Sequence, residues 1–399
     1  MQFSSIIGQQ KLKQQLVASV ENKKIPHAIM LLGNEGSGNL PLALAFAQYL
    51  NCEKVSSLHS NSGELFGEST AKIISDSCGE CSSCLKASKL IHPDIHFTFP
   101  VVSSKDGKSV SKPTSADFME EWRKYFLPNP YLSVQDWLES LDAENKQGNI
   151  TAEECQEIIR KLNLKTFESH FKIFILWMPE LLGKEGNILL KSLEEPQENT
   201  IFILVAENEE AILSTILSRV QIIKVPRIAD EDLIEQLEKN ENIAAKEAHS
   251  IARLANGNYS EALRLIRNAE DDNEKLFLHF LRICVSGKHE NQTLINFTEK
   301  SAGLGRENLK GLIRYGLDLF REVIVLDYLG EKKTRLTESE LKLAQYVNSR
   351  LLLNSKEEIV RKLEESYYHL ERNANPKMLF MNLGIFISQV LKRKEIVLT

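Results

Sequence analysis

Residues 27–50 read HAIMLLGNEGSGNLPLALAFAQYL, and the order of apolar residues and glycines in this stretch decides the fold. Residues 27–32 form a short apolar run that predicts a buried strand. A glycine loop follows over residues 33–40, and residues 41–50 predict an apolar helix. Strand, glycine loop and helix in this order is the context that a phosphate-binding loop requires. The alternative is a glycine turn with no link to nucleotides.

The chain continues with further apolar runs that are typical of strands and are separated by helical patterns. Strands are predicted at residues 95–102, 171–177, 200–206 and 220–225. Helices are predicted at residues 9–20, 151–162 and 211–217, with one more that ends at residue 195 because Pro196 stops it. Apolar strands that alternate with helices indicate a parallel, doubly wound sheet.

The second half of the chain has a different pattern. After Pro226 the strand signal stops, and residues 230–399 are helical in period almost throughout. Three domains are therefore predicted: an α/β domain over residues 1–226, a small helical domain over 227–272 and an all-α domain over 273–399.

Residues 103–149 are polar and irregular and are interpreted as an insertion in the first domain. Two tryptophans in this segment, Trp122 and Trp137, could stack on nucleic-acid bases. Few basic residues accompany them apart from Arg123 and Lys124. Packing, or contact with a partner protein, is therefore the favoured interpretation of both tryptophans.

The composition is that of a globular protein and excludes several classes. The 399 residues carry 49 Lys and Arg against 55 Asp and Glu, a formal net charge of −6, and 42% are hydrophobic. No run approaches the ~18 apolar residues of a membrane span, and the first residues lack the apolar core of a signal peptide. We expect a cytoplasmic protein without a membrane partner. The mildly acidic balance disfavours a strong nucleic-acid binder acting alone.

Six cysteines in such a chain are more typical of metal ligands or core residues than of disulfides. Cys78, Cys81 and Cys84 lie in CGECSSC, a spacing that lets three thiolates close on one ion from a tight turn at Gly79. Tetrahedral zinc needs a fourth ligand, for which Cys52 is the best candidate. The sequence therefore predicts a Zn²⁺ site.

Alternatives to this zinc site stay open. His92 and His59 could replace the fourth cysteine, and the cluster could also be reduced and free of metal. An iron–sulfur cluster is disfavoured because the nearby fourth cysteine of the usual bacterial run is missing. Cys155 and Cys284 stand alone and are expected to be buried rather than reactive.

The glycine loop departs from a working phosphate loop of the form G-x-x-x-x-G-K-[ST]. Gly33, Gly36 and Gly38 supply the glycines that a nest of backbone N–H groups needs. The lysine that reaches the terminal phosphates is replaced by Asn39, and the hydroxyl that holds magnesium by Leu40. Losing both removes groups on which phosphoryl transfer depends, so no functional ATP site is expected.

Five segments in this order resemble the bacterial AAA+ clamp-loader subunits, over about residues 6–268. They are IIGQQKLKQQL (6–16), KIPHAIMLLGNEGSG (24–38), the three cysteines ahead of HPD (92–94), LLKSLEEP (189–196) and TILSRV (215–220). The resemblance implies an AAA+ α/β domain with a zinc module at about 52–84. It further implies a helical lid at 227–272 and a helical collar domain for oligomerisation at 273–399.

The departures from the family's ATPases are as informative as the matches. Where the family carries its metal-binding Asp and catalytic Glu, after the strand KIFIL, this chain has Trp177 and Met178. The polar sensor position after the next strand falls near Ala206 and Glu207, and Ser260 stands where the ATPases carry arginine in the lid. The resemblance therefore implies a subunit that does not hydrolyse ATP itself.

One charged element does match the family. Ser218-Arg219-Val220 aligns with its S-R-C motif, and the resemblance implies that Arg219 acts as an arginine finger in the site of a neighbouring subunit. The alternative is a surface arginine that caps the end of the preceding helix. Glu194 and Glu195 are interpreted as an exposed helix end rather than a carboxylate pair for catalysis.

The resemblance implies a structural subunit of the DNA polymerase III clamp loader, part of the holoenzyme. Its partners would be the ATPase (tau/gamma) subunits, the delta subunit, the sliding clamp indirectly, and primer-template DNA within the complex. Two rivals remain: an atypical AAA+ ATPase that draws its lysine and acid from elsewhere, and a nucleic-acid binder that uses the zinc module.

Overall fold

A computed structural model describes most of the chain. It covers residues 1–60, 75–105, 108–141, 143, 148–241, 243–267, 273–286, 291–304, 306–334, 336–372 and 374–393. Residues 61–74 of the predicted zinc module, parts of the predicted insertion and the predicted boundary at residue 272 lie outside these ranges. The chain divides into two compact units, Met1–Leu263 and Arg264–Thr399.

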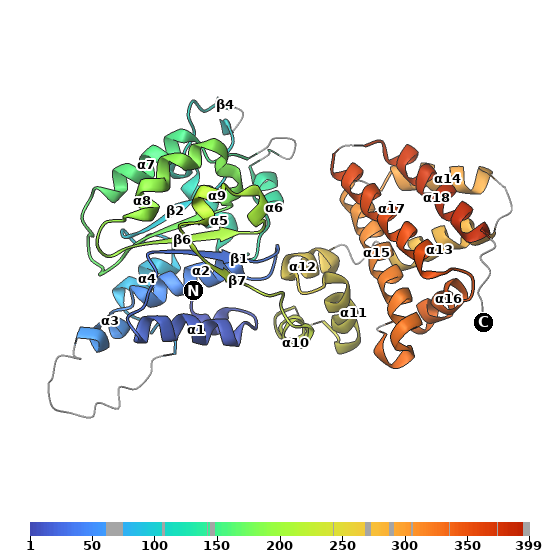
Figure 1. Cartoon of the computed structure of the whole chain (residues 1–399), viewed down its shortest axis with the longest axis horizontal. Coiled ribbons are helices and arrows are strands. Elements are labelled where there is room, and N and C mark those ends of the chain that lie inside the picture. The colour runs from blue at the N-terminus through green and yellow to red at the C-terminus, as the bar shows by residue number, and fades with distance from the viewer. Residues whose placement is uncertain are drawn as a thin grey trace. The chain divides into compact units, whose positions relative to one another are not determined.

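A parallel five-stranded sheet forms the centre of the first unit (Figure 1). Its strands in spatial order are β2 (Ile95–Thr98), β5 (Lys172–Trp177), β6 (Thr200–Ala206), β1 (Ala28–Leu32) and β7 (Gln221–Lys224). Every residue of β5 and of β6 is buried, as expected of central parallel strands covered on both faces. The predicted parallel α/β sheet is confirmed.

The side chains of each strand alternate between two apolar cores, one on each face of the sheet. Ile173, Ile175 and Trp177 of β5 belong to one core, and Phe174 and Leu176 belong to the other. In Figure 1, α7 and α8 lie on one side of the sheet and α1 and α4 on the other. The helical elements of this part are η1 (Phe3–Ser5), α1 (Gln10–Glu21), α2 (Asn39–Leu50), α3 (Glu53–Ser60), α4 (Ser82–Ser88), α7 (Ala152–Leu162), η3 (Pro179–Leu189), α8 (Leu190–Glu194), η4 (Glu209–Ala211) and α9 (Ser214–Leu217).

The predicted insertion carries ordered elements and joins the core. They are β3 (Ser104–Lys105), β4 (Lys108–Ser109), η2 (Ser115–Phe118), α5 (Met119–Phe126) and α6 (Val134–Ser140). Trp122 and Trp137 are 1% and 0% exposed. Trp122 stacks on Phe99 at 4.3 Å between ring centroids, and Trp137 Nε1 donates to Pro100 O at 2.7 Å. Both tryptophans are therefore packing residues, and neither is free to stack on a base.

Helices α10 (Asp230–Asn240), α11 (Ala245–Ala255) and α12 (Tyr259–Arg267) follow the sheet. Residues up to Leu263 belong to the first compact unit, so the contacts do not separate these helices from the α/β body. Their treatment as a distinct lid domain stays a prediction.

The second unit is built from helices. They are α13 (Asn273–Ser286), α14 (Asn291–Ala302), α15 (Arg306–Leu329), η5 (Glu331–Lys333), α16 (Glu338–Asn348), α17 (Leu353–Glu371) and α18 (Pro376–Lys392). The long helix α15 packs against α13, α16 and α17, and α18 packs against α13, α14 and α17. Lys356 is buried, and its Nζ donates to Asp327 Oδ2 at 2.5 Å. None of the helices in the described parts of the chain is long and apolar enough to span a membrane.

Candidate functional site

The glycine loop lies between β1 and α2, where the sequence places it. Gly36 and Gly38 have φ angles of 67° and 91°, in the left-handed region that favours glycine. Gly38 is the residue immediately before α2, and the N–H of Gly33 donates to Ala206 O at the end of β6 (3.0 Å). The loop therefore has the backbone shape of a strand-to-helix phosphate turn and is tied to the neighbouring strand.

Asn39, which is predicted to replace the phosphate-binding lysine, uses its side chain for hydrogen bonds inside the loop. Its Nδ2 donates to Gly33 O at 2.9 Å and to Ala206 O at 3.2 Å, while its Oδ1 accepts from the N–H of Leu40. Asn39 is 6% exposed and Leu40 is 3% exposed. Neither position offers a cation or a metal-binding oxygen to a phosphate.

Three carboxylates surround this end of the sheet. Oε1 of Glu180 accepts from the N–H groups of Glu207 (2.6 Å) and Asn208 (2.8 Å). Burial raises the pKa of Glu207 to about 8, and the negative charges of Glu35 and Glu180 add to the shift. Glu35 belongs to the glycine loop itself. At neutral pH Glu207 is therefore mostly protonated, and the negative charges of Glu35 and Glu180 are the ones that would disfavour a phosphate at this end of the sheet.

The start of helix α12 lies directly on the loop. The N–H of Tyr259 donates to Gly36 O at 3.2 Å, and Asn258 Nδ2 donates to Glu35 Oε1 at 3.3 Å. A Cβ atom added at Gly36 would lie 1.8 Å from Asn258 Oδ1. Asn258 and Tyr259 are therefore in direct contact with the loop at Gly36 and Glu35.

The insertion covers the loop from another direction. A Cβ atom at Gly38 would lie 3.1 Å from the ring of Tyr131, whose hydroxyl accepts from the N–H of Ile7 at 2.9 Å. The rings of Tyr131 and Tyr259 meet edge to face at 5.0 Å. Ser260, at the position where the resembling ATPases carry arginine, donates to Asp136 of α6 at 3.2 Å. The insertion and α12 therefore contact each other beside the loop.

The two residues predicted to replace the metal-binding and catalytic acids, Trp177 and Met178, are apolar and pack in one of the cores of the first unit. Trp177 is 2% exposed, and its ring lies 5.2 Å from that of Trp122. Met178 follows in the left-handed region with φ of 61°, and its N–H donates to Val205 O. An indole and a thioether cannot hold magnesium or accept a proton from water.

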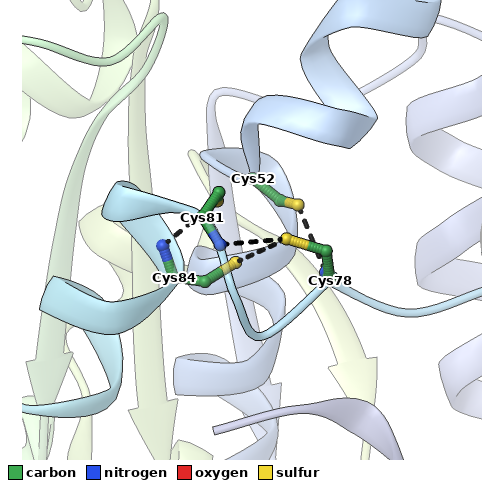
Figure 2. A group of neighbouring side chains, drawn as sticks. All are labelled: Cys52, Cys78, Cys81 and Cys84. Carbon is green, nitrogen blue, oxygen red and sulfur yellow. Dashed lines mark hydrogen bonds between the residues drawn. The ribbon is translucent and has the colours of Figure 1, made fainter.

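The four cysteines predicted as metal ligands come together. Cys52 follows α2, Cys78 and Cys81 lie in the loop ahead of α4, and Cys84 lies within α4 (Figure 2). Their sulfur atoms all lie within 4.8 Å of one another, and Cys78 Sγ and Cys84 Sγ are 3.9 Å apart. The N–H of Cys78 donates to Cys52 Sγ (3.3 Å), and the N–H of Cys81 donates to Cys78 Sγ (3.4 Å).

This donor set fits a tetrahedral zinc ion. Zinc–sulfur bonds of ~2.3 Å in a tetrahedron place the sulfur atoms ~3.8 Å apart, close to the separation of Cys78 and Cys84. A hydrogen bond from Cys84 lowers the pKa of Cys52 to about 4, and the same bond raises the pKa of Cys84. All four are free thiols rather than disulfides.

Of the two alternative histidine ligands, His92 bonds elsewhere. His92 is 4% exposed, and its Nε2 lies 3.0 Å from the hydroxyl oxygens of both Ser83 and Ser169. The side chain of His59 lies outside the described residues. Burial raises the pKa of Cys155 and of Cys284 to about 12, in agreement with the expectation that they are unreactive core residues.

Arg219 lies just after α9 and is held by four hydrogen bonds. Its Nε and Nη2 donate to Glu194 Oε2 at 3.0 and 2.9 Å. Its Nη1 donates to Thr215 O at 2.9 Å and to Ser218 Oγ at 3.2 Å. The contact with Thr215 O is the one expected of an arginine that caps a helix, so capping is part of its structural role.

Comparison with known proteins assigns the chain to a family. A family model described as DNA polymerase III, delta subunit matches residues 8–229, more than half of the chain. The chain belongs to this family. The resemblance to clamp-loader subunits that the five motifs carry is thereby confirmed.

Two proteins of Bacillus subtilis (strain 168) are among the relatives of this DNA polymerase III delta-subunit family member. The subunit delta' is 26% identical over 267 residues, 66% of this chain and 60% of the relative. The subunit tau is 24% identical over 273 residues, 67% of this chain and 37% of the relative. The match thus spans 60% or less of these curated relatives. A solved DNA polymerase III gamma subunit-related protein of Thermotoga maritima matches with a TM-score of 0.40 and 16% identity, covering 95% of this chain and 99% of that chain.

In this member of the delta-subunit family, the predicted residues form separate groups. The three loop glycines lie between β1 and α2, the four cysteines form one cluster, and Arg219 lies beside α8. The sequence analysis missed Glu180, whose carboxylate lies close to the predicted nucleotide site, and did not connect Glu194 with Arg219. The position of Glu180, two residues after Met178 at the end of a predicted strand, was the signal in the sequence that could have identified it.

Proposed function

We propose that the chain is a non-catalytic, delta'-type subunit of a bacterial DNA polymerase III clamp loader. It assembles with ATPase (tau/gamma) subunits and with the delta subunit. The complex then places a sliding clamp on primer-template DNA. Its family and its delta', tau and gamma relatives support this assignment.

The observation that carries the non-catalytic role is the closed glycine loop. Asn39 bonds to Gly33 O and Ala206 O, and the start of α12 bonds to Gly36 O. Asn39 and Tyr259 thus occupy backbone acceptors of the loop, and Glu35 and Glu180 place negative rather than positive charge beside it. We infer that the chain contributes rigidity and contacts to the assembly rather than ATP turnover.

Arg219 is the group that we propose acts in a neighbouring subunit. Four hydrogen bonds order its guanidinium, and its side chain, which is 29% exposed, is still partly open to solvent. A guanidinium that reaches the γ-phosphate of a neighbour's ATP stabilises the charge that develops there. The proposal gives Arg219 this role in addition to the helix-capping contact with Thr215 O.

We propose that the four cysteines hold a structural Zn²⁺ ion. A closed four-thiolate site leaves no position for substrate, and its metal stabilises the fold instead of taking part in chemistry. The site links the end of α2 with α4 through Cys52 and Cys84.

The test of the non-catalytic role is nucleotide binding by the purified chain. Equilibrium dialysis with radiolabelled ATP and magnesium should give no saturable binding at millimolar ATP, and a phosphate-release assay should give no turnover. A tau/gamma subunit from the same source serves as the positive control. Magnesium-dependent hydrolysis that disappears in the variant Glu180→Gln would instead establish the rival, an atypical ATPase that uses Glu180 as its acid.

A further inference from the structure

Arg219 and Glu194 form an ion pair between two short helices that are separated in sequence. Glu194 is the last residue of α8, and Arg219 follows α9, which packs against α8. The Glu194 carboxylate accepts from two different nitrogens of the guanidinium, Nε and Nη2, through one oxygen. The two side chains are 29% and 59% exposed for Arg219 and Glu194.

The four hydrogen bonds fix the orientation of the whole guanidinium. Because this group is planar and its N–H donors form a rigid fork, fixing Nε, Nη1 and Nη2 fixes its plane and its direction. Thr215 O and Ser218 Oγ lie close to Arg219 in sequence and hold Nη1. Glu194 alone holds the Nε and Nη2 side among the contacts that the structure describes. Without it, that side of the group loses its anchor.

We propose that Glu194 is a positioning residue for Arg219. This inference rests on the proposed function, in which Arg219 acts at the γ-phosphate in a neighbouring subunit. An arginine side chain loses rotamer freedom when it is fixed at a ligand, and this ordering cost weakens the interaction. Glu194 orders the guanidinium before it meets the neighbour's nucleotide. Arg219 therefore loses less rotamer freedom when it reaches the γ-phosphate.

The exposure of the pair separates this role from a role in folding. An exposed ion pair contributes little to the stability of a fold, so removing Glu194 should leave the chain folded and able to assemble. Glu195, the next residue, is also exposed and forms no ion pair among those described, which makes it a matched control.

The experiment uses the reconstituted complex with the ATPase subunits, delta, the clamp and primed DNA. ATP hydrolysis is measured for wild type, Glu194→Ala, Glu194→Gln, Glu195→Ala, Arg219→Ala and the double variant Glu194→Ala/Arg219→Ala. We expect Glu194→Ala to lower the stimulated kcat roughly threefold to tenfold with little change in KM. Glu194→Gln should fall between it and wild type because its amide oxygen still accepts a hydrogen bond. Glu195→Ala should match wild type.

The double variant distinguishes positioning from an independent effect. If Glu194 acts through Arg219, the double variant hydrolyses ATP no more slowly than Arg219→Ala alone. Additive losses, a gain of activity in Glu194→Ala, or a loss of thermal stability and assembly that accounts for the lower rate would each overturn the inference. If Arg219→Ala itself has no effect, the finger assignment fails. If Arg219→Ala slows hydrolysis and Glu194→Ala does not, only the positioning role fails.

Discussion

Asn39 bonds to the glycine loop that it belongs to. Its amide donates to Gly33 O and Ala206 O, which are backbone groups of the loop and of β6. In the proposed function Asn39 replaces a phosphate-binding lysine, and these hydrogen bonds give its side chain a structural role instead.

We expect Asn39→Ala to lower the free energy of unfolding by about 1–3 kcal/mol, because two buried carbonyl groups lose a donor. Urea denaturation followed by circular dichroism measures this change. Asn34→Ala, at an exposed position of the same loop, is the control and should stay within about 0.5 kcal/mol of wild type. Equal losses in the two variants would show that the amide of Asn39 does not hold the loop.

Glu207 predicts a pH dependence of stability. Its pKa is about 8 in the folded chain against an ordinary value of 4.5, so the folded state binds this proton more tightly than the unfolded state. Below pH 4.5 the carboxyl group is protonated in both states and does not lower the free energy of unfolding. As the pH rises from 4.5 to 8, it lowers the free energy of unfolding progressively. Glu207→Gln should raise the free energy of unfolding at pH 8 by about 1–4 kcal/mol and change it little at pH 4.5. Urea denaturation at both pH values checks this, and an equal effect at both would contradict it.

The sequence alone could predict the role of a residue where that role depends only on the residue type at one position. The predicted replacement of a lysine by Asn39 and of acids by Trp177 and Met178 rests only on aligning the chain with the motifs of the family, and it stays a prediction. The pairing of Glu194 with Arg219 could not be predicted, because the two residues are 25 positions apart, one at the end of α8 and the other after α9. From the sequence, the neighbouring carboxylates Glu194 and Glu195 indicated only an exposed helix end.

At the scale of elements, the central strands β1, β5 and β6 were predicted well because parallel central strands are continuous apolar runs. The strand expected at residues 95–102 was predicted too long, since β2 ends at Thr98. The helices between them were predicted less well. The expected helix at residues 211–217 begins only at Ser214, since Leu213 is extended with φ of −57° and ψ of 130°. The segment that ends before Pro196 is mostly η3, and it is interrupted at Gly183, where φ is 52° and ψ is −139°. These breaks depend on backbone angles that periodicity does not report.

The contact between α12 and the loop can be tested by placing a methyl group between them. Gly36→Ala should destabilise the chain, because its Cβ would lie 1.8 Å from Asn258 Oδ1 and because φ at this position is 67°. The matched control is the same substitution in an Asn258→Ala background, in which φ at residue 36 is the same but Asn258 Oδ1 is absent. We expect Gly36→Ala to cost at least about 1 kcal/mol more in the wild-type background than in the Asn258→Ala background, in thermal or urea unfolding. Equal costs would mean that α12 does not press on the loop.

The cysteine cluster predicts a metal content. Zinc measured by mass spectrometry should be one ion per wild-type chain, and Cys52→Ser should lower both the zinc content and the melting temperature. Cys155→Ala, at a buried cysteine outside the cluster, should keep the metal. A full zinc content in Cys52→Ser would show that the fourth ligand is a different residue.

The whole molecule combines a closed α/β unit with a helical unit. The first unit has the sheet and the loop of a nucleotide-binding domain, yet its insertion and α12 occupy the surroundings of the loop. The sequence predicted the parallel α/β sheet and the helical second unit, and the loss of catalytic groups stays a prediction. It could not predict this closure, because Tyr131 and Asn258 come from segments remote from the loop and follow no periodic pattern.

The most direct test of this account is ATP hydrolysis by a reconstituted clamp loader. The ATPase (tau/gamma) and delta subunits of the same source are mixed with clamp and primed DNA, with and without this chain, and phosphate release is measured. We predict that the chain alone turns over no ATP, that adding it raises the rate, and that Arg219→Ala assembles normally but loses the stimulation. Turnover by the chain alone, or stimulation by Arg219→Ala equal to that of wild type, would contradict a non-catalytic subunit that acts through Arg219.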